Sequence, residues 1–267
     1  MRKTRIYQPQ DLYAGQTLLL DSEASHHLRK VLRLRAGAEL EVFNGKQAFS
    51  GTLVPGIAAS GISSTATKCV EVLLEQQIQQ DQPDLAEKLS IHLAPAFVKP
   101  APFDLILQKT TELGVARITP LFTEFTQMPV REQRIARRYS HWSKVIHSAC
   151  EQSGRYSVPE LGKHLSFRDF LQTCQSVAGL KLICHPYENH KAKPADIFAW
   201  IQDQIEGKQL PLDIIVLLGP EGGFSNRELA MALDYGFECL QLGASILKAD
   251  TAAIAVMSLL NYSGFQF

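Results

Sequence analysis

The sequence predicts an α/β protein in which a small β-barrel precedes a domain with a mostly parallel sheet. From residue 89 onward, strand-like apolar runs alternate with helical stretches, which is the order of α/β folds. Two of those runs, LKLICHP and LDIIVLLG, are apolar almost throughout, as strands covered on both faces are. Before residue 73 the chain consists of short alternating segments separated by turns, a pattern that favours a barrel.

The barrel is expected to span residues 1–72, followed by a linker over residues 73–88. The run Leu40–Val54 alternates around Asn44-Gly45, which predicts a hairpin because both turn residues tolerate positive φ. The linker is polar, rich in glutamine and interrupted by Pro83. The remaining elements of the barrel are two strands and one short helix, at Thr17–Asp21, Ala66–Leu74 and Ser22–Leu34.

The domain over residues 89–267 is expected to carry the parallel sheet. A short strand ending at Gly243 precedes a final helix over Ala252–Leu260, which is apolar apart from Ser258 and must therefore be enclosed by protein on every side. The other predicted strands are Leu89–Pro95, Arg117–Phe122, Leu180–Pro186 and Leu212–Gly219. The other predicted helices include Pro102–Leu113 and Arg131–Gln152.

Composition argues against a disulfide-bonded, metal-binding, secreted or membrane-spanning protein. The 267 residues hold 27 basic and 27 acidic side chains, yet residues 1–72 alone carry nine Lys/Arg against six Asp/Glu. The five cysteines form no C-x-x-C pair, so free thiols are expected rather than disulfides or a metal site. No leader-like apolar stretch follows the N-terminus, and the longest apolar run is too short to span a bilayer. We therefore expect a soluble cytoplasmic protein without membrane or metal partners.

The stretch LLGPEGGFSNRE, Leu217–Glu228, predicts a ligand site. Ligands of parallel sheets bind beyond the carboxyl ends of the strands, where this glycine loop lies. Gly222 and Gly223 can adopt φ values closed to other residues and leave no Cβ in the way. Ser225 and Glu228 form a capping box, so a helix begins there with its free N–H groups toward the same crevice. A turn without a ligand is the alternative that this loop alone leaves open.

Two loops and three further segments together resemble the SPOUT methyltransferases, and more narrowly the RsmE family, which methylates N3 of a uridine in 16S ribosomal RNA. The loops are GPEGGFSNRE and LGASILKADTA; the segments are SHHLRKVLRLRAG, LQKTTELGVARITPL and ACEQSGRYSVPEL. All five occur in the family's order. The last loop departs from the family's usual G-P-R-x-L-R-x-E-T-A at Ala244, Ser245, Lys248 and Asp250.

The resemblance implies a PUA-like N-terminal barrel and a C-terminal SPOUT-type α/β domain with a trefoil knot. It implies S-adenosyl-L-methionine as the cofactor, 16S rRNA or the small ribosomal subunit as the partner, and a homodimer with the final helix at the knot and interface. The cofactor would lie against His185, Pro186, Leu218, Gly219, Glu221, Gly222, Leu242, Gly243, Ile246 and Leu247. Simple core packing is the alternative for each of Leu242, Ile246 and Leu247 taken singly.

Four further residues would surround the target base, namely Arg155, Glu151, Lys248 and Asp250. Methyl transfer to an imide nitrogen needs the reactants aligned, a cation near the uracil oxygens and an acceptor for the N3 proton. Arg155 would be the cation, and either Asp250 or Glu151 would be the acceptor. Without the resemblance, a helical Glu–Arg pair at this spacing would be taken as a surface ion pair.

A basic segment in the barrel predicts phosphate contacts. Four of its side chains recur at i, i+3, i+4 and i+7, which would place them on one helical face with Leu28, Val31 and Leu32 turned elsewhere. The predicted RNA-binding residues are His26, Arg29, Lys30, Arg33 and Arg35. Arg2, Lys3 and Arg5 would enlarge the same basic surface. A solvated charged face is the alternative.

Two other functions are compatible with the same sequence. The first is a noncatalytic, or differently specific, RNA-binding protein of the SPOUT fold in which the altered last loop has lost activity. The second is an α/β enzyme that acts on a small nucleotide and carries the barrel as an accessory.

Overall fold

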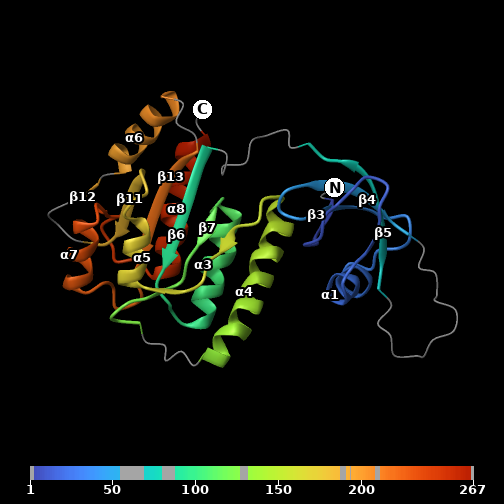
Figure 1. Ribbon diagram of the computed structural model, residues 1–267, viewed down its shortest axis with the longest axis horizontal. Coiled ribbons are helices and arrows are strands. Elements are labelled where there is room, and N and C mark those ends of the chain that lie inside the picture. The colour runs from blue at the N-terminus through green and yellow to red at the C-terminus, as the bar shows by residue number, and fades with distance from the viewer. Residues whose placement is uncertain are drawn as a thin grey trace. The chain divides into compact units, whose positions relative to one another are not determined.

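A computed structural model describes residues 3–54, 69–79, 88–126, 132–186, 191–192, 194–207 and 211–265 (Figure 1). The chain divides into two compact units. The N-terminal unit comprises Met1–Asp81 together with Cys150–Val158, and the C-terminal unit comprises Gln82–Ala149 and Pro159–Phe267. A short segment from the middle of the chain therefore packs with the N-terminal unit.

The N-terminal unit is built on a five-stranded sheet, in the order β1-β3-β4-β5-β2. Its strands are β1 (Thr4–Tyr7), β2 (Thr17–Leu19), β3 (Glu39–Phe43), β4 (Ala48–Leu53) and β5 (Glu71–Gln77). Strand β1 pairs with β3 in parallel, and the other pairs are antiparallel. Alternate side chains enclose one apolar core, which includes Ile6, Leu18, Leu40, Val42, Phe49 and Val72.

The predicted hairpin is confirmed, although its turn is longer than a two-residue loop. Strands β3 and β4 pair from Phe43 to Ala48, leaving four residues in the turn. Only Gly45 has a positive φ, at 91°. Asn44 instead accepts hydrogen bonds on its side-chain oxygen from the backbone N–H groups of Lys46 and Gln47, at 3.0 and 2.8 Å. Its role in the turn is therefore side-chain capping rather than a left-handed backbone.

Strand β5 begins and ends later than the sequence predicts. It runs from Glu71 to Gln77, so it extends into the range expected for the linker. Residues 80–87 of that expected linker lie outside the described residues.

The helix expected at Ser22–Leu34 is shorter and changes its winding. It begins as α1 (Ser22–His26), where Asp21 accepts a hydrogen bond from the Ala24 N–H at 2.8 Å. It continues as a π-helical turn, η1 (His27–Val31), and the N–H of Leu32 donates to the His27 carbonyl. Arg33 then adopts a left-handed conformation with φ 53°, which ends the helix. The prediction of one regular helical face was therefore wrong.

The C-terminal unit contains a seven-stranded sheet in the order β12-β14-β11-β13-β6-β7-β9, and all its pairs are parallel. The predicted α/β class with a parallel sheet is confirmed. The strands are β6 (Leu89–Pro95), β7 (Arg117–Ile118), β9 (Glu160–Leu161), β11 (Leu180–Cys184), β12 (Lys191–Ala192), β13 (Leu212–Leu218) and β14 (Glu238–Leu240). The expected strand Arg117–Phe122 is divided at Pro120, which has no N–H for a ladder, and its second half, β8 (Leu121–Phe122), pairs with β10 (Leu165–Ser166).

Helices cover both faces of this sheet (Figure 1). The helices are α3 (Pro100–Glu112), α4 (Glu132–Ser153), α5 (Phe167–Cys174), α6 (Pro194–Glu206), α7 (Asn226–Asp234) and α8 (Ala249–Phe265). Ile215 and Leu217 of β13 pack in one cluster with side chains of α5 and α7. Neighbouring residues of a strand point to the opposite face, where α8 packs against β13, β6 and α3.

The final helix is longer than predicted, and within one chain it is buried on one side only instead of being enclosed on every side, because Ile254 and Leu259 are half-buried and Ser258 is exposed. Ala253, Val256, Met257 and Leu260 are buried, and Asn261 donates to the carbonyl of Leu113 at 2.8 Å. Because α8 begins at Ala249, Asp250 and Thr251 lie in its first turn and do not cap it. The trefoil knot stays a prediction. Among the described residues, no helix has both the length and the apolarity needed to cross a membrane.

Acidification should destabilise the protein through His92. Burial, with a further contribution from Arg117, lowers the pKa of His92 from 6.5 to about 4. Between pH 6.5 and 4, His92 is protonated in the unfolded chain but stays neutral in the folded chain. The free energy of unfolding should therefore decrease as the pH is lowered, by at most about 3 kcal/mol. Denaturant titrations from pH 7 to 4 measure it. In His92→Gln the free energy of unfolding should depend less on pH. An unchanged pH dependence would contradict its assignment to His92.

Candidate functional site

Three neighbouring strands of the parallel sheet end at the same level. Cys184, the last residue of β11, is the register partner of both Leu218 at the end of β13 and Leu240 at the end of β14. The segments that begin at residues 185, 219 and 241 therefore leave one edge of the sheet side by side. This edge is where α/β sheets bind ligands, and it gathers the three loops that the sequence marks as the cofactor site.

A cavity of about 90 Å³ opens at this edge. Its walls come from the end of β11 and the residues after it, and from the chain that runs from the end of β14 into the first turn of α8, namely Cys184, His185, Pro186, Leu240, Gln241, Leu242, Ser245, Ile246, Leu247 and Ala252. Five of the ten predicted cofactor residues are among them: His185, Pro186, Leu242, Ile246 and Leu247. Ile246 is 90% exposed, so core packing does not explain its apolar side chain.

The other five predicted cofactor residues do not line this cavity. Leu218 is buried at the end of β13, while Gly219, Glu221 and Gly222 belong to the adjacent loop. Gly243 lies in the turn between Leu242 and Ile246, with φ 150°. Sequence reasoning missed several cavity residues, including Gln241, Ser245 and Ala252. Their positions beside the motif residues were the available signal, because a loop that wraps a cavity contributes most of its length.

The glycines of GPEGG are required by the chain itself. A Cβ on Gly222 would lie 3.0 Å from the Cβ of Phe125, and one on Gly219 would lie 3.2 Å from the ring of Phe224. Gly223 has φ 71°, which glycine adopts without strain. The open backbone therefore first serves tight packing, and any ligand benefits from a loop that is already rigid.

The predicted capping box is confirmed and does more than begin a helix. Ser225 caps α7 by accepting from the Glu228 N–H at 3.2 Å, and Glu228 Oε2 accepts from the Ser225 N–H at 2.9 Å. The second oxygen, Oε1, accepts from the backbone N–H of Glu124 at 2.9 Å. One buried carboxylate thus joins the glycine loop to the chain that follows β8.

Replacing Glu228 by alanine should lower the free energy of unfolding by about 2 kcal/mol, because two backbone donors lose their acceptor. Denaturant unfolding measures the loss. Glu238→Ala, at an exposed glutamate of β14, is the matched control and should change stability by less than about 0.5 kcal/mol. Equal effects of the two substitutions would show that the shared carboxylate is unimportant.

The cavity is suited to binding rather than to nucleophilic chemistry. Burial raises the pKa of the Cys184 thiol to about 12, so the sulfur stays protonated at neutral pH. Burial also lowers the pKa of His185, which favours the neutral imidazole. Within the described ranges, no group of three or more His, Cys, Asp or Glu side chains could hold a metal ion.

Two of the four residues predicted around the target base lie in the N-terminal unit. Glu151, in the last turn of α4, accepts a hydrogen bond from the backbone N–H of Tyr7 at 2.9 Å. Burial raises its pKa, and the negative charges of Asp21 and Glu23 raise it further. Arg155 is 8% exposed and its Nε donates to the Ser157 hydroxyl at 2.8 Å. Arg155 is therefore not the solvated surface cation that the alternative of a surface ion pair assumes.

The other two residues, Lys248 and Asp250, lie in the C-terminal unit, where the last loop joins α8. Lys248 is exposed, and its carbonyl accepts the N–H of Ala252 as the helix begins. Asp250 accepts from the N–H of Thr251 at 2.8 Å. The structure thus brings Glu151 close to Arg155 along one segment, and Lys248 close to Asp250 along another.

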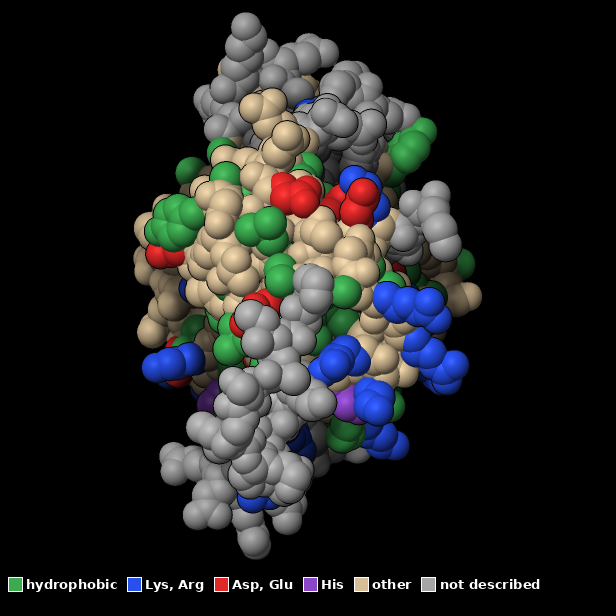
Figure 2. Space-filling view, turned by 90° about the vertical axis from the view of Figure 1, so that its right-hand side faces the viewer, with side chains coloured by type: hydrophobic (Ala, Val, Ile, Leu, Met, Phe, Trp, Pro, Cys, Tyr) green, Lys and Arg blue, Asp and Glu red, His purple; other side chains and the backbone are tan. Residues whose placement is uncertain are grey.

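The predicted RNA-binding side chains are all exposed, namely His26, Arg29, Lys30, Arg33 and Arg35. They extend over α1, η1 and the segment that follows it as far as Arg35, instead of one helical stripe. Leu28 is buried, but Val31 and Leu32 are 59% and 40% exposed, so two of the three apolar side chains expected to turn away do not. Figure 2 shows Lys and Arg side chains gathered on the lower right of one face, with a histidine between them.

Arg5 does not enlarge this basic surface, contrary to expectation. Its Nε lies 2.8 Å from Glu41 Oε2 in an ion pair whose side chains are 19% and 8% exposed. Lys3 is exposed, and Arg2 lies outside the described residues.

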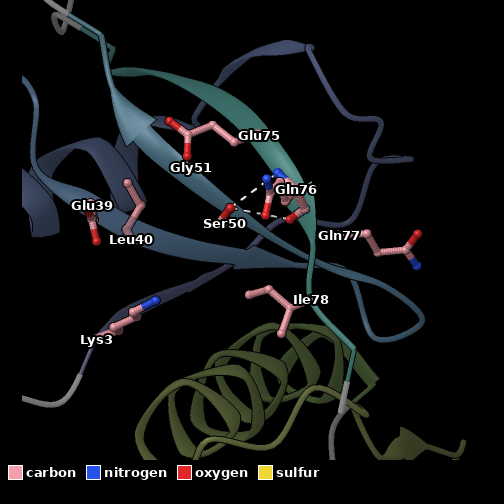
Figure 3. A pocket seen from close by; sticks show the side chains of 9 residues that line it. All are labelled: Lys3, Glu39, Leu40, Ser50, Gly51, Glu75, Gln76, Gln77 and Ile78. Carbon is pink, nitrogen blue, oxygen red and sulfur yellow. Dashed lines mark hydrogen bonds between the residues drawn. The ribbon is translucent and has the colours of Figure 1, made fainter. Parts of the chain in front are cut away.

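A second cavity, of about 380 Å³, lies in the N-terminal unit beside a bulge between β4 and β5. Figure 3 shows Ser50 bonded to the backbone of Gln76 across its floor. The carboxylates of Glu39 and Glu75 are among its walls and disfavour an RNA phosphate there. All its lining residues belong to the N-terminal unit, whereas α/β proteins bind their cofactors at the strand ends of the parallel sheet, which belongs to the C-terminal unit.

Two family models match the chain. Residues 86–261 match the model described as an RNA methyltransferase domain, and residues 20–53 match the RNA methyltransferase PUA domain. The parallel sheet, the site at its strand ends and these two matches define an RNA methyltransferase with a PUA domain.

Individual relatives show which family of RNA methyltransferases this chain resembles. The ribosomal RNA small subunit methyltransferase E of Buchnera aphidicola (strain Sg) is 30% identical over 267 residues, which covers 97% of this chain and 96% of that protein. The enzyme of that name from Neisseria gonorrhoeae, solved with S-adenosyl methionine, is 29% identical with a TM-score of 0.79 over 98% of both chains. A methyltransferase structure from Legionella pneumophila with bound cofactor is 33% identical, with a TM-score of 0.82 and the same coverage. The chain belongs to the ribosomal RNA small subunit methyltransferase E family.

Proposed function

We propose that this protein transfers a methyl group from S-adenosylmethionine to N3 of a uridine in the 16S RNA of the small ribosomal subunit. The observation that carries the proposal is the cavity at the ends of β11 and β14, in a chain that belongs to this family. Relatives solved with the cofactor support the choice of methyl donor. The proposal places the protein in the cytoplasm, with its RNA substrate.

The residues at the strand ends fit the cofactor. Leu242, Ile246 and Leu247 offer apolar walls for an adenine, and the backbone of the same segment offers donors and acceptors for its edge. The neutral imidazole of His185 adds no charge beside a cationic ligand. S-adenosylmethionine would supply an activated methyl group on a sulfonium sulfur.

The side chains of this chain would then handle the charge and the proton of the uracil. When N3 loses its proton, negative charge spreads to the two flanking carbonyl oxygens, and the guanidinium of Arg155 would stabilise that charge. Glu151 and Asp250 are the candidate acceptors of the proton. The raised pKa of Glu151 favours it, because a more basic carboxylate is the better acceptor.

A tritium-transfer assay tests the proposed function. Small-subunit RNA from a strain lacking the gene is incubated with labelled cofactor, and the site of label is mapped. We expect label at one uridine N3, and none in RNA from the parent strain, whose site is already methylated. Cofactor binding without transfer would favour the noncatalytic RNA-binding alternative. Efficient transfer to free nucleotides would favour the small-nucleotide enzyme.

RNA binding should depend on the exposed cations of η1 and of the segment that follows it. Replacing Arg29 and Arg33 by alanine removes two positive charges, so the slope of log K against log salt should fall by about two. Fluorescence titrations of an RNA fragment at several salt concentrations measure that slope. Replacing the exposed Arg168 and Arg227 of the C-terminal unit is the control for net charge. An identical slope in the Arg29 and Arg33 variant would remove these residues from the interface.

We also propose that the protein acts as a homodimer that uses α8. Apolar side chains on that helix are only half-buried in one chain, among them Ile254, Ala255 and Leu259, and Tyr262 is 58% exposed. Light scattering should give a mass near twice 29.7 kDa. A monomer that methylates RNA at full rate would exclude the dimer as the active unit.

A further inference from the structure

The first strand of the chain carries a half-buried arginine with two partners. Arg5 of β1 and Glu41 of β3 are register partners in the parallel pair, and their side chains form the ion pair at 2.8 Å. The hydroxyl of Tyr156 donates to the same oxygen, Glu41 Oε2, at 2.7 Å. A residue from the middle of the chain therefore completes a network that begins at the N-terminus. We call Arg5, Glu41 and Tyr156 the β1 clamp.

Rings and backbone close around this clamp. The Arg5 guanidinium lies 5.6 Å from the centre of the Tyr156 ring, and that ring lies 5.9 Å from Phe43. Gly154 has φ 86°, and a Cβ there would lie 2.7 Å from Arg5 Nη1. The backbone thus passes directly against the guanidinium, in a conformation that favours glycine.

Strand β1 holds the same segment at a second point. The N–H of Tyr7, two residues after Arg5, donates to Glu151 at 2.9 Å. Glu151 and Tyr156 are thus both bonded to the N-terminal sheet, and Arg155 lies between them along the chain. The segment Cys150–Val158 belongs to the N-terminal unit for this reason.

Stability alone does not account for an ion pair of this kind. Two charges lose their hydration on burial, and apolar side chains of the same size often serve as well. The pair instead fixes the position of the segment Cys150–Val158. Glu41 can accept hydrogen bonds from Arg5 and Tyr156 at the same time only when that segment lies in one place. The same segment also carries Arg155, whose Nε is held by Ser157.

We propose that the β1 clamp is a positioning device for methyl transfer, which fixes Arg155 where the charge of the target base develops. The inference rests on the proposed function and on the proposed role of Arg155. Arg5, Glu41 and Tyr156 are positioning residues and do not touch the base. The placement of Arg155 is consequently set by the N-terminal unit, and cofactor affinity is set by the strand ends of the C-terminal unit.

Three substitutions probe the clamp in the full-length protein. Tyr156→Phe removes one hydroxyl and keeps the ring, Glu41→Gln removes the charge, and Arg5→Lys keeps the charge without the Nε–H. Each should lower kcat for RNA methylation, by about 10-fold for Tyr156→Phe and about 100-fold for Glu41→Gln, since small misplacements of a catalytic group are costly. The affinity for S-adenosylmethionine should stay within about twofold in all three. Glu39→Gln, the same change at an exposed position of β3, is the matched control and should leave kcat unchanged.

Combining Glu41→Gln with Arg155→Ala distinguishes a role in positioning Arg155 from a general loss of structure. If Glu41 acts through Arg155, Glu41→Gln should cause no further loss of single-turnover rate in the Arg155→Ala background. Losses that multiply would overturn the inference, as would a wild-type kcat in Tyr156→Phe and Glu41→Gln. If Glu41→Gln does not fold, judged by cofactor binding and circular dichroism, Tyr156→Phe carries the same test. Absence of transfer by the unmodified protein would instead refute the proposed function.

Discussion

Replacing Arg155 by alanine should lower the rate of RNA methylation by about 100-fold or more and leave the affinity for S-adenosylmethionine within about twofold. The reason is that a cation aimed at developing negative charge stabilises the transition state more than the ground state. Arg155 belongs to the N-terminal unit and does not line the cavity at the strand ends, so cofactor binding should not depend on it. Single-turnover tritium transfer measures the rate, and calorimetry measures the affinity.

The control for this substitution is Arg168→Ala, at an exposed arginine of α5. It removes the same charge from a solvated position and should leave both the rate and the affinity unchanged. Unchanged turnover in Arg155→Ala would refute the catalytic role. A loss of cofactor affinity equal to the loss of rate would point to misfolding, which circular dichroism would detect.

Replacing Ala252 by leucine should weaken S-adenosylmethionine binding by about 100-fold, because the larger side chain occupies part of a cavity of only about 90 Å³. Ala252 lies in the first turn of α8, and leucine is nearly as good a helix former as alanine. The backbone should therefore remain in place while the space for the ligand is lost. Calorimetric titration with the cofactor measures the change.

Ala230→Leu provides the matched control for filling the cavity. It makes the same change on an exposed face of α7, outside the cavity lining. Its cofactor affinity should match that of the unmodified protein. Full affinity in Ala252→Leu would mean that the ligand lies elsewhere, and the site at the ends of β11 and β14 would have to be abandoned.

The sequence predicted the core strands of the parallel sheet well. Leu89–Pro95 is reproduced residue for residue, and Leu212–Gly219 differs only at its last residue. Both runs are recognisable because most of their positions are apolar, as strands covered on both faces require, whatever their neighbours in space are. Short strands such as β1 were missed, since four residues do not establish a period.

The candidate site was predicted in part. Motif residues such as His185 and Leu242 do line the cavity, because the ends of parallel strands converge wherever the strands pair. The glycines of GPEGG were assigned to ligand approach, whereas Phe224 and Phe125 crowd the positions where Cβ atoms of Gly219 and Gly222 would lie. Such a contact depends on residues from other parts of the chain and leaves no pattern in the loop.

By itself, the sequence determined the α/β class, the buried strands, the capping box at Ser225 and the exposed basic segment of the N-terminal unit. Each of these depends on a few adjacent residues, whose periodicity or side-chain chemistry suffices. Only the tertiary structure decided that Glu151 and Tyr156 are bonded to the first sheet and that Arg5 is an ion-pair partner rather than a surface cation. Those contacts join residues 36, 115 and 144 positions apart, and pairing at such separations produces no local signal.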